Sequence, residues 1–206
     1  MLETAGVEAD AALLEGWRAR ASRARARLGW TVPGVAARRH AGGASLALAA
    51  PADQLFTATE VNEWALCAAL LAGDPARWGG LEAALAAAPP ESAGDPAAGI
   101  APVLAEEAAL ERLAALASRE ARPDLMKLLE AAGAHSLPYV LDEALLTLGA
   151  GMGGRDFELG SLPAVAAVPW GALHDIPTAL VTGSNGKTTS VRLLAACGEA
   201  HGWRSA

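Results

Sequence analysis

The chain has 206 residues, of which 52% are hydrophobic and 19% are charged. This is enough for one large domain or two small ones with a buried core, and it excludes disorder along the whole length. The formal net charge of -7 opposes long-range attraction to nucleic acid or to an anionic membrane. No apolar run approaches the roughly 18 to 20 residues that span a bilayer, and the acidic start lacks the basic residues of a secretory signal. We therefore expect a cytoplasmic protein without nucleic-acid or membrane partners.

The predicted elements alternate between helices and strands, which indicates an α/β fold with a mixed N-terminal region. Hydrophobic periodicity and turn residues place them, in chain order, as a helix at 5–28, a strand at 45–50, a turn at 51–53, a helix from 57 or 59 to 73, helices at 103–119 and 123–132, and apolar strand-like runs at 137–141 and 144–148. Residues 86–102 are rich in proline and glycine and mark a possible domain boundary.

Three of these helices carry further signals. The first has five arginines between Arg18 and Arg27, and they scatter around the axis instead of forming one stripe. A solvated helix is the favoured interpretation, and a docking surface for an acidic partner is the alternative. The second predicted helix has Thr59 near its start, with Asn62 and Glu63 close by, which supplies capping chemistry. Gly133 is expected to end the helix that begins at residue 123.

A glycine-rich string at residues 149–154, G-A-G-M-G-G, satisfies the dinucleotide-binding pattern G-x-G-x-x-G. Such a loop binds pyrophosphate only where it joins a strand to a helix within one βαβ unit. A strand-like run precedes the string, but no amphipathic helix fits between residues 155 and 170. The sequence therefore favours a flexible turn or lid here over a dinucleotide site.

A second glycine loop lies between residues 175 and 200 in a different context. Residues 179–182 are a short apolar run of strand length, and residues 190–200 are predicted to form a helix that ends at Gly202. Between them stands G-S-N-G-K-T-T, residues 183–189. Strand, glycine loop and helix follow in the order that a phosphate-binding loop requires, which favours that role over a loop that merely starts a helix.

Each residue of this loop suits the binding of a polyphosphate. Gly183 and Gly186 permit backbone angles that a Cβ would penalise, and Asn185 tolerates left-handed angles. Successive amides can then point at phosphate oxygens, helped by the positive end of the following helix. Lys187 places a compact positive charge near the β and γ phosphates, and the hydroxyl of Thr188 can ligate Mg²⁺.

The loop departs from the general Walker pattern, because residue 181 is Val where that pattern has its first glycine. It resembles instead the phosphate loop of the Mur ligase superfamily, whose usual form is T-G-T-N-G-K-T/S-T, with Ser184 in place of a threonine. That superfamily includes peptidoglycan-precursor ligases, folylpolyglutamate synthases and the C-terminal half of cyanophycin synthetases.

The resemblance implies a fold, an activity and a site. The fold would be an N-terminal α/β domain at 1–170, followed at 171–206 by the first strand, P-loop and helix of a P-loop NTPase-like central domain. The activity would be amide-bond formation, in which ATP phosphorylates a substrate carboxylate and an amine attacks the acyl phosphate. Lys187 would be catalytic by stabilising charge on the transferring phosphoryl group, and Thr188 would hold Mg²⁺. The implied ATP-binding residues are Gly183, Ser184, Asn185, Gly186, Lys187, Thr188 and Thr189.

Ligases of this kind also need a further acidic metal ligand, an acceptor cleft and a C-terminal domain, which the 19 residues after Lys187 cannot hold. We therefore expect part of a longer ligase that is inactive alone, with ATP and small-molecule carboxylate and amine substrates as partners. Two alternatives remain open: a non-catalytic nucleotide-binding or interaction module, and another P-loop phosphotransferase such as a kinase.

Residues outside the loop carry little chemistry. Cys67 and Cys197 lie far apart, so neither a disulfide framework nor a zinc site is indicated, and both are expected to be small buried thiols. Asp142 and Glu143 follow a strand, where an exposed turn is favoured over a catalytic pair. The histidines are too scattered to suggest a metal cluster: His40, His135, His174 and His201.

Overall fold

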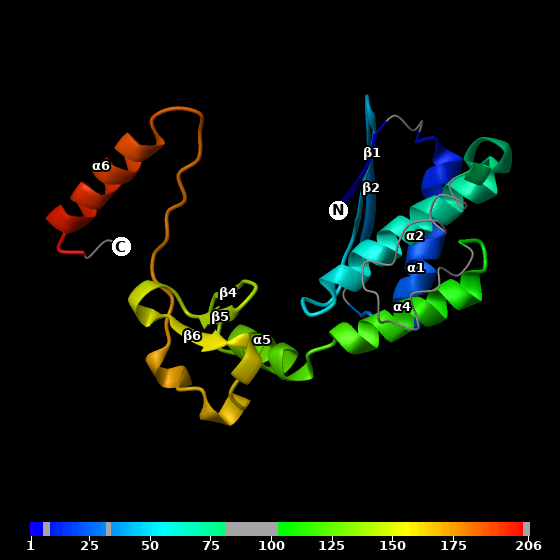
Figure 1. Cartoon of the computed structure of the whole chain (residues 1–206). Helices are drawn as coiled ribbons and strands as arrows, with labels where there is room; N and C mark the ends of the chain where they lie inside the picture. Colours follow the sequence, from blue (N-terminus) through cyan, green and yellow to red (C-terminus); the bar gives the residue numbers. More distant parts are fainter. Residues whose placement is uncertain (6–8, 32–33, 81–102, 204–206) are drawn as a thin grey trace. The chain divides into compact units, whose positions relative to one another are not determined.

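The computed structural model of the chain describes residues 1–5, 9–31, 34–80 and 103–203 (Figure 1). They belong to two compact units, Met1–Arg122 and Pro123–Ala206, and both are mixed α/β with a small antiparallel sheet. The expected boundary at 86–102 lies outside the described residues, and the other expected boundary was near residue 170. In the structure the two units meet in sequence at Pro123, where α5 begins.

The first unit contains a three-stranded antiparallel sheet of β1 (Leu2–Ala5), β2 (Val35–His40) and β3 (Gly43–Leu48), in the order β1-β3-β2. The strand predicted at 45–50 is confirmed as β3, two residues earlier than expected. Ala44 and Leu46, two residues apart on β3, are fully buried, as the alternation of side chains in a strand requires. The central strand therefore presents one face to the core of the unit.

Three helices of the first unit pack together beside this sheet: α1 (Ala11–Arg27), α2 (Leu55–Gly73) and α4 (Glu106–Glu120) (Figure 1). The helices predicted at these places are confirmed with shifted ends. In the core, the fully buried Trp17 donates its indole N–H to Asn62 Oδ1 at 2.8 Å, and the Asn62 side chain donates to the Leu46 carbonyl at 3.3 Å. This chain of bonds joins α1, α2 and β3.

The N-terminus of α2 is capped from another helix. The helix begins at Leu55, so Thr59, Asn62 and Glu63 lie inside it and the expected local cap is wrong. The N-cap residue, Gln54, makes no side-chain capping bond. Instead the carboxylate of Glu120, at the end of α4, accepts hydrogen bonds at 2.7 Å from the backbone N–H of Phe56, from the backbone N–H of Thr57 and from the Thr57 hydroxyl. A carboxylate at a helix N-terminus satisfies orphan donors and complements the helix dipole.

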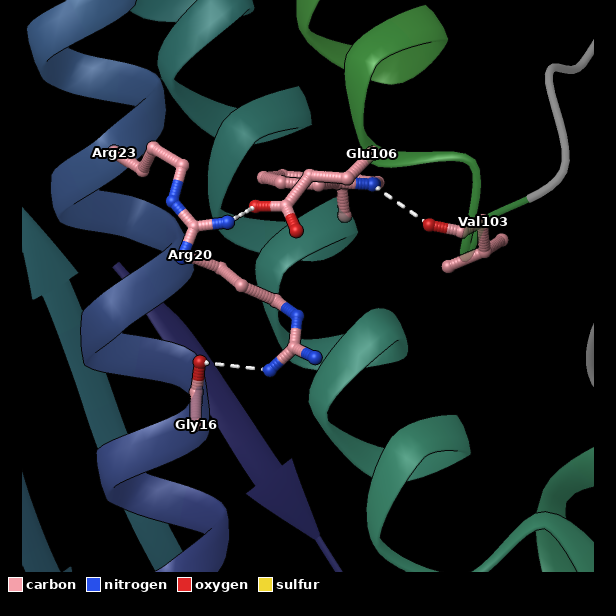
Figure 2. Close-up of polar contacts among 6 residues, drawn as sticks. Gly16, Arg20, Arg23, Val103 and Glu106 are labelled. Carbon is pink, nitrogen blue, oxygen red and sulfur yellow. Dashed lines mark hydrogen bonds and ion pairs between the residues drawn. The ribbon is translucent and has the colours of Figure 1, made fainter.

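Polar contacts join the N-terminal end of α4 to α1 and α2 (Figure 2). Arg23 on α1 forms an ion pair with Glu106, and the Trp64 indole N–H donates to the Val103 carbonyl at 3.1 Å. The buried positions of α1 are apolar: Leu14, Trp17, Ala21 and Ala24. The arginines of α1 therefore lie outside the core, and Arg23 has its acidic partner within the same chain.

The second unit begins with α5 (Pro123–Ala134) and a three-stranded antiparallel sheet of β4 (Tyr139–Leu141), β5 (Leu145–Leu148) and β6 (Arg155–Glu158), in that order. The strands predicted at 137–141 and 144–148 are confirmed as β4 and β5. Gly133 does not end α5 as expected but lies inside it, and the turn comes at Ser136, whose φ is 53°.

Short 3-10 turns follow β5 and β6, and the chain ends in α6 (Lys187–Ala200). Trp170, in η4 (Trp170–Ala172), stacks on His135 after α5 with ring centroids 4.7 Å apart, and its indole N–H donates to Val165 at 2.9 Å. These contacts hold the segment after β6 against the end of α5.

A candidate phosphate-binding loop

The residues before the glycine loop are extended but do not form the predicted strand. No strand is assigned at 179–182, and Leu180 is 89% exposed. A strand exists only through hydrogen bonds to a neighbouring strand, and the described part of the chain supplies no such neighbour to this segment. The apolar character of these residues alone was therefore insufficient to predict a strand. These residues do not form the sheet of a P-loop NTPase.

The loop itself has the backbone that its glycines predicted. Gly183 has a φ of 145° and Gly186 a φ of 78°, both in the region that side chains with a Cβ rarely adopt. Gly186 is the N-cap of α6, and the first bond of the helix runs from the Ser190 N–H to the Gly186 carbonyl at 2.9 Å. The loop therefore turns directly into the helix.

The first turn of α6 offers donors to an anion. The N–H groups of Lys187, Thr188 and Thr189 precede the first intrahelical bond, so no helix carbonyl satisfies them. The helix dipole adds a partial positive charge at the same end. The helix predicted at 190–200 is confirmed with a start at Lys187, and Gly202, with a φ of 81°, follows its end as expected.

Lys187 folds back over the loop. Its ammonium donates to the Gly183 carbonyl, four residues earlier, so the positive charge lies across the loop instead of pointing away from it. All residues from Gly183 to Ser190 are exposed, including Ser184, Asn185 and Thr188. The structure thus brings together the predicted loop residues, their free amides and one lysine.

The glycine-rich string at 149–154 is a turn, as the sequence favoured. It joins β5 to β6 through η1 (Gly151–Gly153), so the next element after it is a strand and not the helix of a βαβ unit. Two hydrogen bonds of 3.1 Å link it to His174: the His174 N–H donates to Gly153, and the Ala150 N–H donates to the His174 carbonyl. A Cβ on Gly153 would crowd that carbonyl, so the glycine allows the chain leading to the phosphate-binding loop to pack closely.

Other predicted features have plain structural roles. Asp142 is in an exposed turn between β4 and β5 and accepts N–H bonds of 2.8 Å from Ala144 and Leu145, which hold its pKa below the usual range. Cys197 is exposed, against expectation, and no residue of α6 is buried. Cys67 is half-buried, and burial raises the pKa of its thiol.

Within the described ranges, no cluster of three or more histidine, cysteine or acidic side chains could hold a metal ion. None of the helices described here has the length and apolar character needed to cross a membrane. Comparisons with protein-family models, curated proteins and solved structures find no match to this chain.

Proposed function

We propose that this chain is the ATP-binding portion of a Mur-type ligase, which joins a carboxylate to an amine through an acyl phosphate. The observation that carries the proposal is the loop at 183–189: its sequence resembles that superfamily's phosphate loop, and its backbone turns through two glycines of positive φ into a helix N-terminus. The residue types of the loop and its backbone both fit a bound polyphosphate.

Each loop residue has a role in this proposal. The backbone amides of the loop and of the first helical turn bind phosphate oxygens, and Gly183 and Gly186 let the chain approach them closely. Lys187, whose ammonium already lies across the loop, stabilises negative charge on the transferring phosphoryl group. The exposed Thr188 hydroxyl would hold Mg²⁺, which neutralises charge between phosphates.

Thr188 is exposed, and its hydroxyl oxygen suits Mg²⁺, which prefers oxygen ligands and keeps several of its own waters. Phosphate oxygens and waters would supply most of the other ligands, and the further acidic ligand that the resemblance implies would come from outside the loop. A carboxylate ligand is not required from the loop itself. The residues of the loop therefore fit a Mg-ATP complex better than a bare metal ion.

Nucleotide selectivity tests this assignment. Titration calorimetry with Mg²⁺ present should show binding of ATP and ADP and none of AMP or adenosine, because the loop recognises a polyphosphate. Thr188→Val should weaken ATP binding in Mg²⁺ but leave binding in EDTA unchanged, since only the metal contact is lost. Equal binding of adenosine and ATP would contradict the proposal.

Ligase chemistry needs a second assay, in which release of ADP by the whole protein is measured against panels of amino acids and carboxylate acceptors. Release that requires both a carboxylate and an amine supports a ligase. Release with one hydroxyl substrate alone would favour a kinase, and binding without any release would favour a nucleotide-sensing module.

A further inference from the structure

A groove in the first unit lies far along the sequence from the phosphate-binding loop. It has a volume of about 420 Å³, within the roughly 300 to 1,000 Å³ typical of small-molecule sites. Its walls come from α1, the end of α2 and the helical residues 75–80 that follow. Aliphatic side chains, chiefly Leu13, Leu70 and Ala69, line part of it.

Two arginines line the groove without a carboxylate partner in the described part of the chain. Arg20 extends from α1 toward α2 and donates to the Gly16 carbonyl at 3.1 Å, as Figure 2 shows. The Arg77 guanidinium lies over the ring of Trp78, 4.9 Å from its centroid. A guanidinium has five N–H donors, so each of these arginines keeps donors for a ligand.

Two carboxylates line the same groove and are fixed by helix caps. Asp10 accepts from the Leu13 N–H at 2.7 Å, and Asp74 accepts from the Arg77 N–H at 3.0 Å. Each bond occupies one carboxylate oxygen and leaves the other available. The groove therefore presents two positive and two negative side chains beside an apolar wall.

We propose that this groove binds a free amino acid with an aliphatic side chain. A bare anion would meet Asp10 and Asp74, and a bare cation would meet the two arginines, whereas a zwitterion satisfies both signs. The carboxylate of the ligand pairs with a guanidinium, its ammonium pairs with a carboxylate, and its side chain lies on the aliphatic wall and Trp78. This inference does not depend on the ATP-binding proposal.

Calorimetry with the purified chain and no nucleotide tests it, with L-leucine as the probe. Isocaproate lacks the ammonium and isoamylamine lacks the carboxylate, and each should bind at least about tenfold more weakly than leucine. Arg20→Gln and Arg77→Gln should each weaken leucine binding about tenfold. Arg18→Gln is the matched control, because Arg18 is on α1 but pairs with Glu15 at 3.5 Å and does not line the groove.

Circular dichroism should show that all three variants remain folded, because none of these arginines is in the core. Binding of isocaproate as tight as that of leucine would overturn the zwitterion site. So would no leucine binding by the unaltered protein, or equal leucine affinities of the Arg77→Gln and Arg18→Gln variants. Since no nucleotide is present, these outcomes would leave the ATP-binding proposal standing.

Discussion

Glu120 should be one of the most important charged residues for the stability of the first unit. Its carboxylate accepts three hydrogen bonds of 2.7 Å at the start of α2, and Thr57, which supplies two of them, is fully buried. Hydrogen bonds to a charged group contribute about 1.5 to 3 kcal/mol each, but three bonds to one carboxylate are not additive. Water can also replace Glu120 at the exposed Phe56 N–H. We expect Glu120→Ala to lower the free energy of unfolding by about 2 to 3 kcal/mol.

Urea unfolding followed by tryptophan fluorescence measures this loss, because four of the six tryptophans are in the first unit. Glu120→Gln keeps one acceptor oxygen and should lose about 1 kcal/mol. Glu111→Ala is the control, since Glu111 is exposed on the same helix, and it should change stability by less than about 0.5 kcal/mol. Equal midpoints for Glu120→Ala and Glu111→Ala would refute the capping role.

Three further predictions follow from single contacts. Gly43→Ala should prevent formation of the first sheet, because φ at Gly43 is 143° and a Cβ there would overlap the Thr4 carbonyl. The loss is measured as a decrease of the far-ultraviolet circular dichroism signal. Gly29→Ala is the control: φ at Gly29 is 70° with open space around it, so this change should lower the free energy of unfolding by only about 1 kcal/mol. Trp17→Phe removes the indole N–H bond to Asn62 and should cost about 1 to 3 kcal/mol by urea unfolding, and a smaller loss would mean that this bond is not needed. The N–H bonds from Ala144 and Leu145 lower the pKa of Asp142 in the folded protein, so the stabilising contribution of its carboxylate is present at neutral pH and is lost as the pH falls through that lowered value. Carboxyl NMR should show Asp142 titrating below the usual range of an aspartate, and Asp142→Asn should abolish the acid dependence of this turn.

Helices and central strands were predictable because their signals are local. The apolar spacing of α4 and α5 and the apolar run at β5 each report burial on one side of a single element. The start of α2 was not predictable in the same way. Its cap comes from Glu120, 63 residues after Thr57, and nothing near α2 in the sequence indicates that partner.

The edge strand β2 and the segment before the phosphate-binding loop both show that a strand depends on its pairing partner as well as on its own residues. β2 was missed because most of its residues are exposed and its second half is polar, yet pairing with β3 makes it a strand. Residues 179–182 have strand composition but no pairing partner in the described chain, so they remain extended and exposed. The backbone of the loop after them could be predicted from residue types alone, because the positive φ of Gly183 and Gly186 is a local property of glycine.

The central claim is that Lys187 and the amides around it bind the phosphates of Mg-ATP. The chain has only one other lysine, Lys127, which pairs with Asp124 at 3.3 Å on α5, so Lys127→Ala is a control with the same change of charge. In calorimetric titrations with Mg-ATP, Lys187→Ala should weaken binding by at least about tenfold while Lys127→Ala leaves it unchanged. Equal affinities of the Lys187→Ala and unaltered proteins, or no ATP binding by the unaltered protein, would contradict the account.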